Sequence, residues 1–226
     1  VGYNYSVPLD KWNIMDQAAD YIFAGNTDVA FQIPGTLGII LNAEKWKTLE
    51  DTTRKYPLLN EHQFMMDGEL SSDLNFVKAD DEMVYNAEFI AALKRSSKTV
   101  LVLSTNHDHA VASMRRAFIE LINQGCQTPV IIERSYSDID AESTQLYSSI
   151  DIGALFVDGL GDGTWLTTDA MNAREINALS FGILQATRSR ISKTEYISCP
   201  SCGRTLFDLQ ETTAKIRKRT DHLKGL

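Results

Sequence analysis

Two cysteines near the end of the chain carry the clearest chemical signal: Cys199-Pro200-Ser201-Cys202-Gly203. Two intervening residues let a tight turn direct both thiolates at one metal centre. Proline fixes its own φ, whereas Gly203 can adopt a positive φ and point its backbone N–H at sulfur. The pattern predicts that Cys199 and Cys202 are metal ligands. Zinc ribbons, rubredoxin-like sites and iron–sulfur clusters share this geometry, so the motif alone does not identify the metal.

The same cysteines could instead form a dithiol redox pair or carry no ligand. A redox pair usually lies at a helix N-terminus, where the dipole lowers a thiol pKa. The next helix is predicted later, over Thr212–Leu223, with Asp208 as N-cap and Glu211 three residues on. A closed zinc site needs two further ligands, and neither Cys126 nor the four histidines form a second motif with suitable spacing. The metal site therefore looks half built.

The composition is that of a globular protein, with 43% hydrophobic and 23% charged residues among 226. A net charge of -8 disfavours nucleic acid as a partner, because phosphate backbones are held by Lys and Arg. No apolar run approaches the roughly 20 residues that span a bilayer. We therefore expect a cytoplasmic protein with no membrane contact. The start at Val1 and the half-built site lead us to expect a segment of a larger enzyme.

Short apolar runs alternate with amphipathic stretches through the middle of the chain, which predicts βα units with parallel strands. The predicted strands are Thr99–Ser104, Pro129–Arg134 and Ala154–Val157. The predicted helices carry Val111, Met114, Phe118, Leu121 and Ile122 on one face before Gly125, and then cover Glu142–Ile150 and Ala173–Arg188.

The flanking segments fit this scheme less cleanly. We predict helices at Lys11–Ala24, Ala43–Tyr56 and Asp81–Lys94, and strands at Leu37–Leu41 and Glu195–Ser198. The fold class is therefore α/β, with (βα) repeats in a TIM-barrel-like or incomplete barrel domain over residues 1–192. Residues 193–226 are predicted to be the truncated start of a second, α+β domain that carries the cysteines.

The string Tyr196–Gln210 (YISCPSCGRTLFDLQ) resembles the start of the cluster domain of the 4-hydroxy-3-methylbut-2-enyl diphosphate synthase family. The resemblance implies a [4Fe–4S] cluster held by three cysteines and a glutamate, of which Cys199 and Cys202 match the first two. The other two ligands belong to a Gly-Cys-x-Val-Asn-Gly-Pro-Gly-Glu segment that this sequence lacks. The resemblance further implies that residues 1–192 are the α/β domain inserted in the long form of this family.

For the parent enzyme, the resemblance implies reduction of the cyclic diphosphate 2-C-methyl-D-erythritol 2,4-cyclodiphosphate to 4-hydroxy-3-methylbut-2-enyl diphosphate, in isoprenoid biosynthesis. Flavodoxin or ferredoxin would donate two electrons through the cluster, and the parent could form a homodimer. This segment alone should be inactive, with no catalytic residue of its own.

The sequence departs from the family pattern at Gly159-Leu160-Gly161-Asp162, which is followed by Trp165 and Thr167 where short-form members have diphosphate-binding Arg and Ser. Tryptophan cannot replace the bidentate contacts of arginine.

Two readings from other functional classes stay open. One is a non-catalytic zinc-knuckle module whose dimer completes a four-cysteine site. The other is an independent small-molecule enzyme that uses His107 and Asp158. His107-Asp108-His109 follows a predicted strand but is more typical of a helix start, and Asp158 and Asp162 could hold a cation but more often mark a turn.

Overall fold

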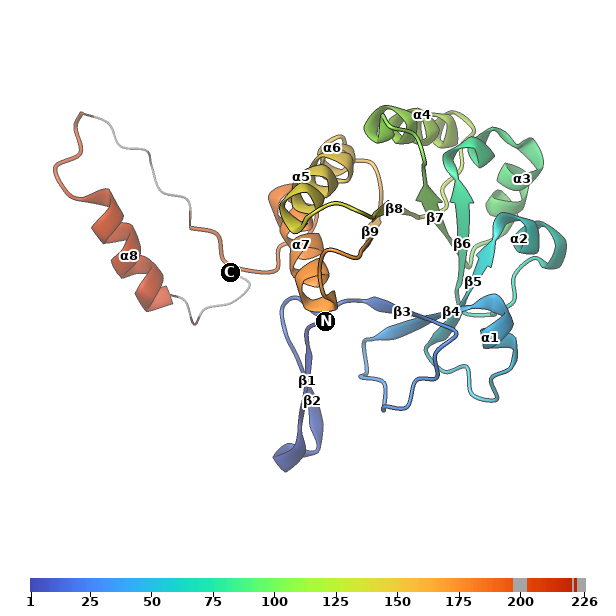
Figure 1. Ribbon diagram of the computed structural model, residues 1–226, viewed down its shortest axis with the longest axis horizontal. Helices are drawn as coiled ribbons and strands as arrows, with labels where there is room; N and C mark the ends of the chain where they lie inside the picture. The colour runs from blue at the N-terminus through green and yellow to red at the C-terminus, as the bar shows by residue number, and fades with distance from the viewer. Residues whose placement is uncertain (197–202, 221, 223–226) are drawn as a thin grey trace.

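The computed structural model describes residues 1–196, 203–220 and 222, and its main feature is a seven-stranded sheet in the order β3-β4-β5-β6-β7-β8-β9 (Figure 1). All neighbouring strands are parallel. The strands are β3 (Tyr21–Gly25), β4 (Gly38–Asn42), β5 (Lys55–Asn60), β6 (Asn75–Asp80), β7 (Thr99–Ser104), β8 (Val130–Tyr136) and β9 (Gly163–Thr168). Because the spatial order equals the chain order, the sheet curls in one direction. The α/β prediction of an incomplete, TIM-barrel-like domain is confirmed.

Helices connect successive strands from β4 to β9, α7 follows β9, and these helices cover the convex side of the sheet (Figure 1). They are α1 (Ala43–Lys47), α2 (Glu61–Asp67), η2 (Asp81–Tyr85), α3 (Ala87–Arg95), α4 (Ala110–Asn123), α5 (Ala141–Asp151), α6 (Gly153–Val157) and α7 (Ala173–Ala186). The main core lies between these helices and the sheet, where Leu101 and Leu103 of β7 and Ile132 of β8 are fully buried. Burial on both faces explains why the strands are apolar throughout.

Aromatic rings fill the concave side of the sheet. Tyr21 of β3 packs edge-on against Tyr56 of β5 and Phe76 of β6, with ring centroids 5.8 and 5.1 Å away. Phe23 of β3 lies 5.1 Å from Trp165 of β9, so the two edge strands touch through side chains although they do not pair. The concave side is therefore packed around the buried Phe76, whereas Tyr21 and Phe23 on the edge strand β3 stay 39% and 47% exposed.

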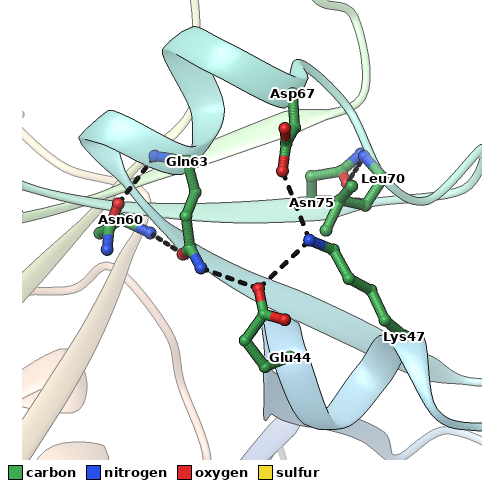
Figure 2. Close-up of polar contacts among 7 residues, drawn as sticks. All are labelled: Glu44, Lys47, Asn60, Gln63, Asp67, Leu70 and Asn75. Atoms are coloured by element: carbon green, nitrogen blue, oxygen red, sulfur yellow. Dashed lines mark hydrogen bonds and ion pairs between the residues drawn. The ribbon is translucent and has the colours of Figure 1, made fainter.

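Polar contacts fix the corner where β5 meets its two flanking helices (Figure 2). The Asn60 side chain accepts from the Gln63 backbone N–H, and the Gln63 side chain accepts from the Asn60 N–H. This capping box starts α2. Glu44 of α1 accepts hydrogen bonds from both Gln63 and Lys47, and Lys47 reaches Asp67 at the end of α2. The contacts hold α1 and α2 together at the carboxyl end of β5.

The prediction of a helix at Lys11–Ala24 is wrong. This stretch forms β2 (Lys11–Ile14), which pairs antiparallel with β1 (Tyr3–Ser6) around η1 (Val7–Leu9), and then the edge strand β3. Tyr5 and Trp12 pack together in the hairpin with centroids 5.3 Å apart. Cross-strand aromatic contacts outweigh the helical spacing of the apolar residues, because strand stability depends on the neighbouring strand.

The prediction of a strand at Ala154–Val157 is also wrong. These residues belong to α6, where Leu155 and Phe156 are buried in the main core. The third strand of the series is β9, Gly163–Thr168, for which the sequence pattern predicts no element. A four-residue apolar run fits a buried helix turn as well as a strand, since periodicity cannot distinguish them over that length.

Three further predictions need correction at their boundaries. The helix predicted at Ala43–Tyr56 is only α1, followed by β5. The helix predicted at Asp81–Lys94 is split into η2 and α3, because Asn86 caps α3 by accepting from the Glu88 and Phe89 N–H groups. Glu195 and Tyr196 are not in a strand, and Ile197 and Ser198 lie outside the described residues. The strands at Leu37–Leu41, Thr99–Ser104 and Pro129–Arg134 and the helices at Glu142–Ile150 and Ala173–Arg188 agree within a few residues.

The turn into β9 needs a glycine at position 161. Its φ is +90°, and an added Cβ would lie 2.6 Å from Cδ1 of the fully buried Ile132. We expect Gly161→Ala to destabilise the fold by about 1–3 kcal/mol, because both backbone strain and overpacking oppose it. Chemical denaturation measures this loss. Gly182→Ala is the matched control: it meets nothing within 4 Å in the middle of α7, where alanine favours a helix, so unchanged or higher stability is expected.

Candidate functional site: the cysteine turn and the strand ends

Cys199 and Cys202 lie outside the described residues, but residues on both sides of them contact each other. The Tyr196 hydroxyl is 2.8 Å from the Thr220 hydroxyl at the end of α8 (Leu209–Thr220). The Arg217 guanidinium lies 5.8 Å from the centroid of the Tyr196 ring. The far end of α8 therefore lies beside Tyr196. The predicted boundary near Lys193 remains a prediction.

The start of α8 agrees with the predicted cap. The Asp208 carboxylate accepts a hydrogen bond from the Glu211 N–H at 2.9 Å, and the Thr212 hydroxyl donates to the Asp208 carbonyl. Four basic residues follow in the second half of the helix: Lys215, Arg217, Lys218 and Arg219. Lys215 forms an exposed i,i+4 ion pair with Glu211 at 2.6 Å. The helix thus begins with acidic and ends with basic residues, as the helix dipole favours.

The donor set of the cysteine turn suits an iron–sulfur cluster, because such clusters are held chiefly by thiolates. Two thiolates at Cys-x-x-Cys spacing supply half of a four-ligand set. Within residues 1–196, 203–220 and 222, no group of three or more His, Cys, Asp or Glu side chains could hold a metal ion. Cys126 lies partly buried beside Thr128, with its Sγ 3.5 Å from the Thr128 hydroxyl. The described residues therefore do not complete the site.

The motif His107-Asp108-His109 follows β7, where His107 lines a hollow of about 240 Å³ with Asp81, Ser113 and Arg116. Ser113 of α4 donates to the buried Asp81 carboxylate. Burial opposes the charged form of Asp81, but hydrogen bonds from Ser113 and other neighbours lower its pKa nonetheless. The pKa of Asp80 is raised, first by burial and also by the adjacent Asp81.

These groups are paired with one another at the strand ends. His107 Nε2 lies 3.6 Å from Glu82 Oε1, and Asp80 caps η2 by accepting from the Glu82 N–H. Asp81 and Ser113 join η2 to α4. The arrangement favours a structural role at a helix start over an acid–base site.

The glycine-rich loop before β9 uses both of its carboxylates in structural contacts. Asp158 forms an ion pair with Arg115 of α4 at 2.5 Å, and Asp162 accepts from the Val130 N–H at 2.8 Å. Gly159 and Gly161 adopt positive φ angles of 78° and 90°. The loop is a tight turn between α6 and β9, which supports the turn prediction over a cation site.

One ion pair on the concave face of the sheet was not predicted from the sequence. Lys78 of β6 donates to Glu133 of β8 at 2.6 Å across the concave face, and the Glu133 side chain is only 6% exposed. Its Oε2 has no hydrogen-bond partner in the part of the chain that the structure describes. The available signal was a charged residue inside each of two apolar strand runs, NFVKAD and PVIIER.

In the described residues, no helix has the length and apolar content to cross a membrane. No protein-family model matches the chain. Curated proteins match it over most of its length. It is 40% identical over 209 residues, 92% of the chain, to a Parabacteroides distasonis protein named 4-hydroxy-3-methylbut-2-en-1-yl diphosphate synthase (flavodoxin). The equally named Bacteroides thetaiotaomicron protein is 40% identical over 208 residues, also 92% of the chain.

A third relative of the same name, from Leptospira interrogans, is 52% identical over 99 residues, which are 43% of this chain and 15% of that protein. The two longer matches each cover 33% of the relative. The chain thus spans about one third of the length of these curated relatives.

Proposed function

We propose, because the chain belongs to the 4-hydroxy-3-methylbut-2-en-1-yl diphosphate synthase family, that it is a segment of an isoprenoid-biosynthesis oxidoreductase. The observation that carries this proposal is the 40% identity that extends over 92% of the chain to proteins of that name. The proposed reaction of the parent enzyme is reductive opening of 2-C-methyl-D-erythritol 2,4-cyclodiphosphate to 4-hydroxy-3-methylbut-2-enyl diphosphate. The segment alone should be inactive, since Cys199 and Cys202 match only two of the four ligands of the proposed cluster.

Within this proposal, Cys199 and Cys202 supply two thiolate ligands of a [4Fe–4S] cluster, and the other ligands come from the rest of the parent protein. The cluster supplies one-electron transfers to the substrate. Residues 1–192 form the inserted α/β domain, and residues 193–226 are the start of the cluster domain, in which Tyr196 contacts Thr220 at the end of α8.

The proposed electron donor is flavodoxin, which the names of the relatives include, or ferredoxin. Both are acidic proteins in their usual forms, and the basic second half of α8 gives a surface of opposite charge. Raising the ionic strength should therefore slow electron delivery to the parent enzyme.

The decisive experiment is anaerobic purification of the full-length parent protein, followed by metal analysis and a turnover assay. We expect four irons and four sulfides per chain. We also expect conversion of the cyclic diphosphate when reduced flavodoxin is present. Stoichiometric zinc without a cluster, together with a stable dimer, would instead establish the zinc-knuckle module. A cluster-bearing protein that leaves the cyclic diphosphate unchanged would refute the proposed reaction.

A further inference from the structure

The helix α5 turns its apolar side chains away from the core. Thr144 and Ser148 are fully buried, whereas Leu146, Tyr147 and Ile150 are 56%, 48% and 51% exposed. An amphipathic helix on a globular domain normally packs its apolar side inward. Here the polarity is reversed, and three large apolar residues share the outer side of the helix.

Hydrogen bonds within α5 define its first turn, and a contact with β9 fixes its orientation. Asp140 caps the helix by accepting from the Ser143 N–H at 2.7 Å. On the buried side, the Thr144 hydroxyl donates to the Asp140 carbonyl at 2.9 Å and lies 3.5 Å from the Thr168 hydroxyl of β9. Turning the helix to bury Leu146 would break the contact between Thr144 and Thr168 and expose the buried Thr144 and Ser148, so the outward apolar side belongs to the packed arrangement of α5.

The surface around this helix extends the apolar area. Val157 of α6, the helix that directly follows and contacts α5, is 72% exposed. A hollow of about 570 Å³ lies between α5 and α7. Gln145 and Ser149, which neighbour Leu146 and Ile150 on α5, line one wall, and the other wall includes Leu179 and Ile183 of α7. Contiguous exposed apolar surface beside a groove is characteristic of an interaction site.

We propose that the apolar face of α5 and α6, comprising Leu146, Tyr147, Ile150 and Val157, docks against the remaining two thirds of the parent polypeptide. This inference rests on the proposed function, since it requires that the chain is a segment of a protein as long as its relatives, of which it covers 33%. None of these four side chains is charged, so the surface that packs against them should be apolar.

The size of the face favours an intramolecular partner over a second copy of the chain. Four half-exposed side chains offer on the order of 400 Å². A stable complex of free proteins needs about 800 Å² per partner. A covalently linked partner has an effective concentration in the millimolar range, so a smaller face is enough.

The test is cysteine labelling of the full-length protein carrying Ile150→Cys, with the modified position identified by peptide mass spectrometry. Met66→Cys is the matched control, because Met66 is 74% exposed on α2, which follows β5 in the middle of the sheet and lies away from α5 (Figure 1). Each native rate is divided by the rate of the same variant unfolded in urea. We expect Ile150→Cys to react about tenfold more slowly than Met66→Cys, at every protein concentration.

Equal normalised rates would overturn the proposal, because the α5 face would then be free in the full-length protein. Protection that disappears on dilution, with a change from dimer to monomer, would also overturn it in favour of a second copy. Iron content and turnover are measured on the same preparations. An active protein with a freely reacting Cys at position 150 refutes the docking alone, whereas a protected position in a protein without cluster or activity refutes the proposed function alone.

Discussion

Replacing Cys199 by alanine in the full-length parent protein is expected to remove the proposed iron–sulfur cluster and the proposed catalytic turnover together. With one thiolate of the Cys-x-x-Cys pair gone, the turn can no longer hold a cluster iron. We expect activity to fall by at least about 100-fold, the upper range seen when even the outer partners of a metal site are lost. Cys202→Ala should have the same effect. Iron and acid-labile sulfide per chain, measured anaerobically, are compared with the rate of product formation.

Cys126→Ala provides the matched control for a lost thiol. Cys126 packs against the main core and lies beside Thr128, within the α/β domain. Its replacement should leave cluster content and turnover unchanged, with a small loss of stability. The circular dichroism of Cys199→Ala should equal that of the parent protein, because the sheet and its helices are complete before Thr194. A full cluster in Cys199→Ala would show that this turn does not ligate it.

The central strands could be predicted from sequence because parallel strands buried on both faces are recognisable without knowledge of their partners. The run Thr99–Ser104 is β7, and all six of its residues pair in register with β6. The following helix was equally clear, since Met114, Phe118 and Leu121 recur at helical spacing and are all buried. Strong local patterns therefore fixed the middle of the sheet.

The elements that were misassigned depend on distant neighbours. Residues Tyr21–Gly25 form a strand because β4 lies beside them, and Phe23 is held by Trp165 from the opposite edge of the sheet. The run Ala154–Val157 is helical because Leu155 and Phe156 fit into the core beneath α4 and α7. Local spacing carries no information on such contacts, so tertiary packing decides these segments.

The candidate site was predictable where its chemistry is local. The cysteine turn and the cap at Asp208 are short motifs, and the cap is confirmed by its hydrogen bond to Glu211. Lys78 and Glu133 are 55 residues apart in the sequence. Their contact depends on the order of the strands, because β7 lies between β6 and β8 in the sheet. No spacing rule predicts such a contact.

This pair should make Lys78→Met one of the most destabilising single changes in the α/β domain. Glu133 is buried, and Lys78 is the group that balances its charge at 2.6 Å. Removing one partner of a buried ion pair typically costs about 3–5 kcal/mol, because the other charge stays desolvated. Since the Lys78 side chain is 47% exposed, we expect the lower end, about 3 kcal/mol. Urea denaturation of the full-length protein, followed by circular dichroism, measures the loss.

Two further variants show whether the unpaired carboxylate causes this loss. In the double variant Lys78→Met with Glu133→Leu, no charge is left in the concave core, and stability should return to within about 1 kcal/mol of the parent. Lys215→Met removes an ion pair of similar length, 2.6 Å, but both of its partners are exposed, so a change below about 0.5 kcal/mol is expected. If the double variant stays as unstable as Lys78→Met, then the loss of stability comes from the lost packing of the lysine stem and not from the unpaired buried charge of Glu133.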